Sequence, residues 1–135
     1  MENITKTLTI TTNKPEEMIN VTSIIEKELN KTNIKTGTIT IFVPHTTAAV
    51  TINENADPDV KKDILFGLAK SFPKHKEYKH FEGNSFAHIK SSVIGVSQTL
   101  LVDDGKILLG QWQGVYYCEF DGPRSRNLII RISGK

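Results

Sequence analysis

The sequence predicts an α+β fold with a mostly antiparallel, β-sandwich-like core and two to three covering helices. Three observations predict it. Short segments with alternating apolar and polar residues recur, two stretches carry apolar residues at helical spacing, and an Asp-Gly pair separates two apolar runs, which is a strong hairpin signal. The 135 residues suit a single domain, 1–135, and a domain of this size buries roughly two thirds of its unfolded surface.

The N-terminal third predicts a strand, a helix and a second strand. Residues 4–12 alternate threonine with apolar residues, which is typical of a half-buried strand. Pro15 suits the first position of a helix, because its missing N–H group has no partner there anyway. Residues 36–43 predict a strand that Pro44 ends by removing a ladder donor. The helix after Pro15 has these residues at helical spacing: Met18, Val21, Ile24, Ile25 and Leu29.

The middle of the chain predicts a strand and two helices separated by a loop. Residues 48–52 favour a short strand. Asp57, followed by proline, is a strong helix start, and an amphipathic pattern continues from it. Residues 73–83 lack periodicity and are expected to form a loop. Residues 86–94 predict a short helix, for which Ser85 is the expected N-cap.

The C-terminal part predicts two antiparallel pairs. Residues 97–102 and 107–109 flank the Asp-Gly turn and are expected to form a hairpin. Residues 114–120 and 127–133 are expected to pair with each other. Cys118 alternates with aromatic residues in the first of these strands, so we interpret it as buried filling and not as a nucleophile.

Composition predicts a cytoplasmic protein. The single cysteine allows no intrachain disulfide, which suits a reducing compartment. No apolar run approaches the roughly 18 residues of a membrane span, so no membrane partner is expected. The net charge is only +2, and the lysines between residues 70 and 79 form no long basic stripe. No nucleic-acid partner is therefore expected.

Three histidines form the first candidate site. His45, His80 and His88, with Glu54 or Asp57 in support, offer the donors that a divalent metal such as zinc accepts. Their spacing matches no stereotyped motif, so two interpretations are open. The histidines either bind metal or are polar loop residues, and Asp57 is either a ligand or only a helix cap.

Two further clusters suggest ligand binding. An anion could use a helix N-terminus together with cationic side chains, although each residue alone is commonly a capping or surface group. Trp112 between two glutamines could stack on a flat ring, or could be a core or subunit-contact residue. Glu119 could orient a histidine, hold a metal-bound water, or be a solvated strand residue. The candidate anion pocket comprises Thr46, Thr47, Asn84, Ser85, Lys90, Arg124 and Arg126.

Several blocks of the chain, read in order, resemble the YjbQ family. They are HTTAAVTINENADPD at 45–59, NSFAHIK at 84–90, LGQWQG at 109–114 and CEFDGPR at 118–124. Members of this family are often labelled secondary thiamine-phosphate synthases. The resemblance implies a compact α+β fold and a homotrimer with polar pockets near subunit boundaries. It also implies a set of motif residues: His45, Asn53, Glu54, Asp57, His80, Asn84, His88, Lys90, Trp112, Gln113, Glu119 and Arg124.

The activity implied by the resemblance joins a pyrimidine methyl diphosphate to a thiazole phosphate and releases pyrophosphate. We expect His88, Glu54 and Lys90 to be catalytic. A divalent metal, Mg²⁺ or Zn²⁺, is the expected cofactor, with Mg²⁺ held by Glu54 or Asp57 beside the leaving group. Two alternatives are a metal-dependent hydrolase of a phosphorylated metabolite, and a non-catalytic trimeric module that binds a metabolite or metal. The expected substrate-binding residues are Asn53, Asn84, Ser85, Trp112, Gln113, Glu119 and Arg124.

Overall fold

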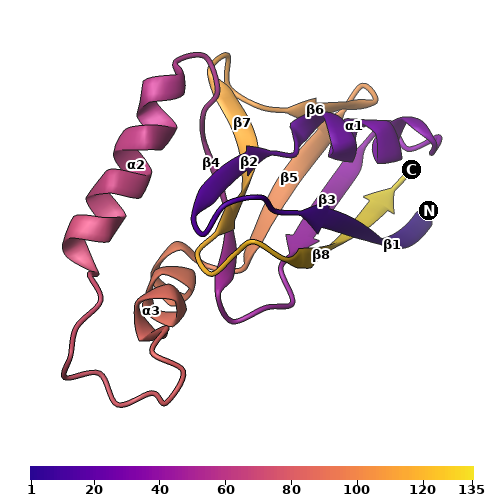
Figure 1. Cartoon of the computed structure of the whole chain (residues 1–135). Coiled ribbons are helices and arrows are strands. Elements are labelled where there is room, and N and C mark those ends of the chain that lie inside the picture. The colour runs from indigo at the N-terminus through magenta and orange to yellow at the C-terminus, as the bar shows by residue number, and fades with distance from the viewer.

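The computed structural model describes residues 1–135, which form two antiparallel sheets and three helices (Figure 1). One sheet has the strand order β1-β8-β3-β5-β6 and the other the order β2-β7-β4. The predicted α+β fold is therefore confirmed. In chain order the elements are β1 (Glu2–Thr11), β2 (Glu17–Asn20), α1 (Thr22–Asn30), β3 (Gly37–Phe42), β4 (Ala48–Glu54), α2 (Pro58–Ser71), α3 (Ser85–Ile94), β5 (Ser97–Asp103), β6 (Lys106–Leu108), β7 (Gln113–Glu119) and β8 (Ser125–Gly134).

The main core lies between the two sheets. Ile39 and Ile41 of β3 and Ile130 of β8 belong to the same buried apolar cluster as Val115 and Tyr117 of β7. Successive side chains of a strand point to opposite faces, so the intervening residues of β3 and β8 lie on the outer face of the five-stranded sheet. Helix α1 contacts β6 of one sheet and β7 of the other, and thereby closes one side of the sandwich.

The helix predicted from Pro15 begins later than expected. Residues Glu17–Asn20 form β2, which pairs with β7, and α1 starts only at Thr22. The Oε2 atom of Glu17 accepts hydrogen bonds from the backbone N–H groups of Asn13 and Lys14 at 2.6 and 2.8 Å. Glu17 therefore closes a turn that leads into a strand, where the sequence pattern predicted a first helical turn.

The prediction that the last two strands pair with each other is wrong. Strand β7 lies between β2 and β4, whereas β8 lies between β1 and β3 in the other sheet. The inward faces of both strands are apolar. These faces pack against each other across the core, and the two strands are not neighbours in one sheet. The Tyr117 hydroxyl of β7 spans the sandwich and donates to the Asn127 carbonyl oxygen of β8 at 3.1 Å.

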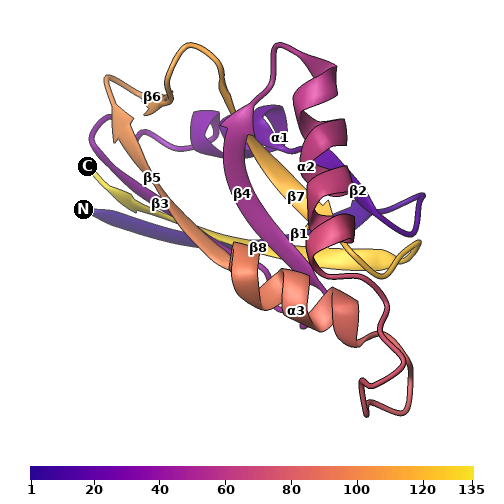
Figure 2. The same ribbon diagram turned by 90° about the vertical axis from the view of Figure 1, so that its left-hand side faces the viewer.

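Helices α2 and α3 lie against the three-stranded sheet (Figure 2). Helix α2 begins as predicted, because Asp57 accepts a hydrogen bond from the Asp59 N–H group at 2.9 Å. Helix α3 is also confirmed, but its N-cap is Asn84 and not Ser85. Cys118 is buried as predicted. It belongs to the second apolar cluster, together with Met18, Ala49, Ala87, Tyr116 and Phe120.

The remaining local predictions agree with the structure. The hairpin of β5 and β6 turns at Asp104 and Gly105, whose φ angles are 50° and 74°. This left-handed conformation suits an Asp-Gly pair between twisted strands. Strands β1, β3 and β4 overlap the predicted ranges, and the segment between α2 and α3 is a loop that projects from the body of the molecule (Figure 1). None of the three helices is long and apolar enough to cross a membrane.

Candidate functional site

A polar cavity lies where the loop after β3 meets helix α3. Its volume is about 390 Å³. His45 and Thr46 reach it from the loop, and His88 reaches it from the helix. Two imidazoles from distant parts of the sequence therefore share one cavity. The complete lining is His45, Thr46, His88, Ser91, Ser92, Gly95 and Val96.

The two serines of the cavity follow His88 at helical spacing. Residues three and four positions apart lie on the same face of a helix, so Ser91 and Ser92 belong to the face that carries His88. The Ser91 hydroxyl donates to the Ala48 carbonyl oxygen at 2.6 Å, whereas Ser92 makes no side-chain hydrogen bond. Sequence reasoning did not select these serines, although the spacing to His88 was a visible signal.

The geometry around His45 fixes where its proton lies. The Asn127 N–H group donates to Nε2 of His45 at 2.9 Å. A ring nitrogen that accepts a hydrogen bond carries no proton, so the neutral ring is protonated on Nδ1. Burial lowers the pKa of His45, and the positive charges of Arg126 and Arg124 lower it further against the opposing effect of Glu119. His45 is therefore a neutral hydrogen-bond donor.

His88 lies beside His80 from the neighbouring loop. Their ring centroids are 5.2 Å apart and the rings are close to perpendicular, at 87°. Nε2 of His80 is 3.9 Å from a carboxylate oxygen of Glu82. The His88 ring makes no side-chain hydrogen bond within the chain, so both of its nitrogens are available to a ligand.

The residues expected to hold a metal do not form one set in this chain. No group of three or more His, Cys, Asp or Glu side chains is close enough together to hold a metal ion. Nε2 of His45 is occupied by a backbone donor, and Asp57 caps helix α2. His80 and His88 do lie together, but with Glu82, which is 3.9 Å from His80, they do not make a group of three donors close enough to hold a metal ion. The residues of one chain therefore do not fit the predicted metal.

A buried ion pair lies beneath the His45 loop. Glu119 is 0% exposed and Arg126 is 2% exposed. Nε of Arg126 donates to Glu119 Oε1 at 2.8 Å, and a second guanidinium nitrogen donates to Oε2. Burial alone would raise the pKa of Glu119, but hydrogen bonds from Arg126, the Asp121 N–H group and Thr12 outweigh it and lower that pKa. Glu119 is therefore a buried anion and not the solvated strand residue that was considered.

Arg124 and Asn84 meet at Asp121, in the segment between β7 and β8. Nδ2 of Asn84 donates to Asp121 Oδ2 at 2.9 Å, and an Arg124 guanidinium nitrogen donates to the same atom at 3.0 Å. These contacts tie the start of α3 to the β7–β8 crossover. The Oδ1 atom of Asn84 is buried and has no partner, and Ser85 follows as the first residue of the helix.

Lys90 does not face the histidine cavity. It is 1% exposed, and its ammonium group donates to Glu16 Oε2 at 2.7 Å. The same group lies 5.3 Å from the centre of the Phe86 ring and 5.7 Å from that of Phe120. Two positions along a helix differ by about 200°, so Lys90 and His88 point to different sides of α3. Lys90 anchors the helix to the loop before β2.

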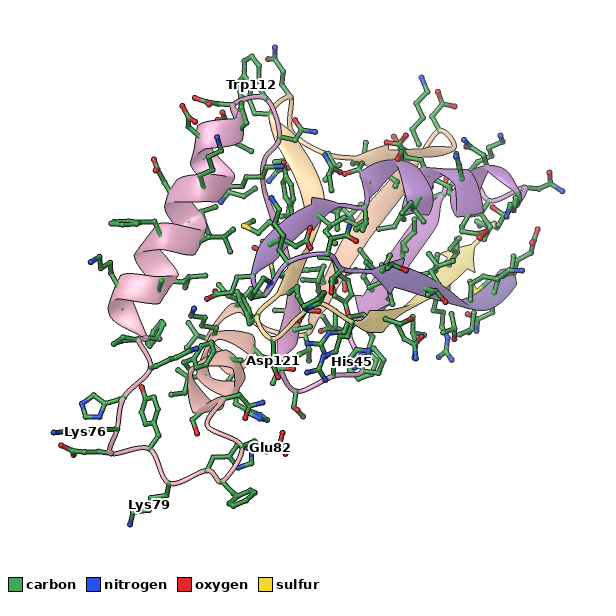
Figure 3. The ribbon with its side chains drawn as sticks, viewed as in Figure 1. His45, Lys76, Lys79, Glu82, Trp112 and Asp121 are labelled. Carbon is green, nitrogen blue, oxygen red and sulfur yellow. The ribbon has the colours of Figure 1, made fainter.

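The remaining predicted residues form a second cluster at the far end of the same strands. Strands β4 and β7 pair from Ala48 opposite Glu119 to Glu54 opposite Gln113. Six residues of strand span roughly 20 Å. Glu54 and Trp112 therefore lie far from the His45 loop within one chain, and Figure 3 shows Trp112 and His45 well apart. The second cluster comprises Asn53, Glu54, Asp57, Trp112 and Gln113.

The polar side chains of this second cluster mainly accept hydrogen bonds from nearby backbone N–H groups. Glu54 Oε2 accepts from the Asp57 N–H group at 3.2 Å, and the Gln113 side-chain oxygen accepts from the Gly110 N–H group at 2.7 Å. The Asn55 N–H group donates to the Trp112 carbonyl oxygen at 2.8 Å. The Trp112 side chain itself is 57% exposed. Trp112 is therefore not a core residue, and it stacks on no ring of this chain.

Comparison with known proteins identifies the family. A sequence model described as UPF0047 protein YjbQ-like matches residues 6–135. The chain belongs to the YjbQ family. It is 52% identical over 130 residues to the UPF0047 protein YugU of Bacillus subtilis, covering 96% of this chain and 98% of that protein. It is also 52% identical over 125 residues to a UPF0047 protein of Methanocaldococcus jannaschii, covering 93% and 91% of the two chains.

Solved structures of the YjbQ family have the same fold. An uncharacterized conserved protein of the family from Clostridium acetobutylicum is 47% identical and superposes with a TM-score of 0.92, covering 95% of this chain and 99% of that one. A YbjQ-like protein of unknown function from Sulfolobus solfataricus is 29% identical and has a TM-score of 0.94 over 99% of both chains. The two-sheet arrangement is therefore shared with these two proteins.

Proposed function

We propose that this YjbQ-family protein is an enzyme that acts on a phosphorylated small molecule in the cavity between His45 and His88. The observation that carries the proposal is that two imidazoles with different chemistry face one cavity. His45 is held as a neutral donor, whereas His88 lines the same cavity and makes no side-chain hydrogen bond within the chain. A free imidazole is the side chain best suited to acid–base chemistry near neutral pH.

In the proposed mechanism His88 carries the proton and His45 donates through Nδ1 to a substrate oxygen. The hydroxyl groups of Thr46 and Ser92 supply further polar contacts. Two cations near this end of the molecule are already paired, Lys90 with Glu16 and Arg126 with Glu119. The substrate's negative charge would therefore be met mainly by hydrogen bonds from neutral groups at the cavity wall.

The first reaction to test is the transfer that the family resemblance implies. The thiazole nitrogen attacks the methylene carbon of the pyrimidine methyl diphosphate as the carbon–oxygen bond to the diphosphate breaks. The electron pair leaves with pyrophosphate, and in this proposal His88 protonates an oxygen of that leaving group. Metal dependence remains a prediction, and no step of this scheme uses a protein-bound metal.

The cavity volume favours a second candidate, the hydrolysis of a single phosphorylated metabolite. At about 390 Å³ the cavity lies near the lower end of the range for ligand sites, roughly 300–1,000 Å³. A cavity of this size suits one metabolite of moderate size better than two organic substrates together. In this reaction His88 would activate water as a general base.

Pyrophosphate release tests the proposal. The purified protein is supplied with both thiamine precursors, first with Mg²⁺, then with Zn²⁺, and then with a chelator. Release that requires both precursors and falls sharply in His88→Ala supports the transferase. The matched control is His75→Ala, because His75 is an exposed loop histidine outside the cavity.

Other outcomes of this assay separate the alternatives. Phosphate release from single phosphorylated metabolites, lost in His88→Ala, supports the hydrolase. Ligand binding without turnover would leave only the non-catalytic binding module. Equal activity of His88→Ala and the wild type would refute an enzyme that works at this cavity.

We further propose that the chain forms a homotrimer. The outer face of the five-stranded sheet supports association, because no helix covers it and it displays large apolar side chains. Phe42 of β3 is 43% exposed, and Leu101 of the adjacent β5 is 57% exposed. The trimeric number comes from the family resemblance. Light scattering coupled to size exclusion tests it, with Leu101→Lys expected to shift the protein toward monomer.

A further inference from the structure

Asn127 reaches His45 because strand β3 ends early. In the register of β3 with β8, Phe42 lies opposite Ile129, so continuing the ladder would place Pro44 opposite Asn127. Strand β3 stops at Phe42, and the Asn127 N–H group donates to Nε2 of His45 at 2.9 Å instead. The imidazole thus takes the place of a strand carbonyl.

Arg126 holds both partners of this contact. It directly precedes Asn127, and its side chain is buried between the sheets. One guanidinium nitrogen donates to Thr47 Oγ1 at 2.8 Å and to the Thr47 carbonyl oxygen at 3.1 Å. Thr47 lies two residues after His45. Arg126 therefore fixes the segment that carries the donor and also the segment that carries the imidazole.

Glu119 fixes Arg126 in turn. Both carboxylate oxygens accept from the guanidinium group. Glu119 Oε1 also accepts from the Thr12 hydroxyl at 2.8 Å, and Oε2 accepts from the Asp121 N–H group at 2.9 Å. One nitrogen of Arg126, Nη2, donates to Thr47 and to Glu119, while Nε donates to the other oxygen of Glu119, so the two carboxylate contacts fix the plane of the guanidinium group. A lysine ammonium is a point charge with no such plane.

We infer that Arg126 is a positioning residue that, through Thr47 and Asn127, locks His45 in the tautomer protonated on Nδ1. The lock makes His45 a dedicated donor to an acceptor oxygen of the ligand, such as a phosphate or carbonyl oxygen. It also prevents His45 from serving as a base or metal ligand through Nε2. The role toward a ligand rests on the proposed function, whereas the tautomer is a property of the protein alone.

Nitrogen-15 NMR of the imidazoles tests the lock without any substrate. The protein has four histidines, and the signals of His45 are those missing from His45→Gln. We expect the wild type to show a protonated Nδ1 and an unprotonated Nε2 on His45. Arg126→Lys keeps the positive charge beside Glu119 but loses the planar guanidinium group, so His45 should show a mixture of both tautomers.

Two further variants make the experiment decisive. Arg131→Lys makes the same change on the outer face of the same strand, where Arg131 bonds only to Thr5, and should leave the His45 signals unchanged. Thr47→Val removes one acceptor of Arg126 while keeping the ion pair, and should also give mixed tautomers. If Arg126→Lys does not fold, the tautomer of His45 in Thr47→Val tests the inference.

The outcomes separate this inference from the proposed reaction. A wild type with its proton on Nε2 of His45 overturns the inference, and so does a wild-type tautomer in both Arg126→Lys and Thr47→Val. In the pyrophosphate assay, Arg126→Lys should reduce kcat/KM in proportion to the fraction of His45 that leaves the Nδ1-protonated tautomer. A shifted tautomer in Arg126→Lys, with no pyrophosphate release by the wild type, supports the lock and refutes the reaction.

Discussion

Removing the carboxylate of Glu119 should destabilise the fold strongly. In Glu119→Leu the Arg126 guanidinium stays buried, at 2% exposure, without its counter-charge. Breaking a buried ion pair on one side costs about 3–5 kcal/mol of unfolding free energy. A chain of 135 residues has an unfolding entropy of about 0.28 kcal/mol per degree, so Tm should fall by roughly 10–18 °C.

A double variant tests whether the unpaired charge causes this loss. Glu119→Leu with Arg126→Met leaves no buried charge at this site, and the Thr47 carbonyl oxygen still accepts from the Phe120 N–H group at 3.2 Å. The double variant should therefore be more stable than Glu119→Leu alone. Calorimetry measures both at one protein concentration, because association shifts Tm. A Glu119→Leu protein within about 1 kcal/mol of wild type, or a double variant less stable than the single one, would refute the reasoning.

Three shorter predictions concern titration and reactivity. The folded pKa of Glu119 lies below its ordinary value of 4.5. The contribution of Glu119 to the free energy of unfolding is therefore complete above pH 4.5 and is lost as the pH falls through the folded pKa. Urea titrations at several pH values should show that the free energy of unfolding falls less steeply with acid in Glu119→Gln than in the wild type. Burial raises the pKa of Cys118 to about 12, so a thiol reagent at pH 8 should label it only when the protein unfolds. Lys90→Met should lower Tm clearly more than Lys76→Met, since only Lys90 is buried in an ion pair; equal values would remove its anchoring role.

Local signals in the sequence predicted the elements that local chemistry fixes. Asp57 followed by proline begins α2 because the cap and the first turn lie within three residues. The hairpin at Gly105 depends on a two-residue turn with positive φ angles. In both cases the residues that decide the structure are neighbours in the chain, so the pattern alone is sufficient.

The errors have a common physical origin in contacts that are distant in sequence. β2 exists because Glu17–Asn20 pair with β7 about a hundred residues later, and the apolar spacing around Val21 also suits a helix. The prediction that β7 pairs with β8 was wrong because two apolar strands can be neighbours in one sheet or can face each other from opposite sheets. Arg126 was assigned to a candidate anion pocket because only the fold shows that it is buried in an ion pair with Glu119.

At the candidate site, too, the sequence indicated what neighbouring residues decide and missed what distant contacts decide. Sequence reasoning selected His45 and His88, and the structure shows that they share a cavity. The sequence could not show that Lys90 faces Glu16 instead, because the choice between two sides of a helix depends on what packs against each side. Nor could it show that Glu54 lies at the other end of the strand ladder from His45, since both sit beside strand ends in the sequence.

The length of that ladder leads to a test of which residues share a substrate. Glu54 and the His45 loop lie at opposite ends of β4, roughly 20 Å apart by strand geometry. A metabolite that fills a cavity of about 390 Å³ cannot contact both within one chain. Glu54→Gln should therefore leave turnover unchanged, whereas loss of the acid–base group in His88→Ala should reduce it by about 100-fold or more. If both variants lose turnover while their Tm values stay at that of the wild type, Glu54 must act from a neighbouring subunit, because the fold of one chain holds the two residues apart.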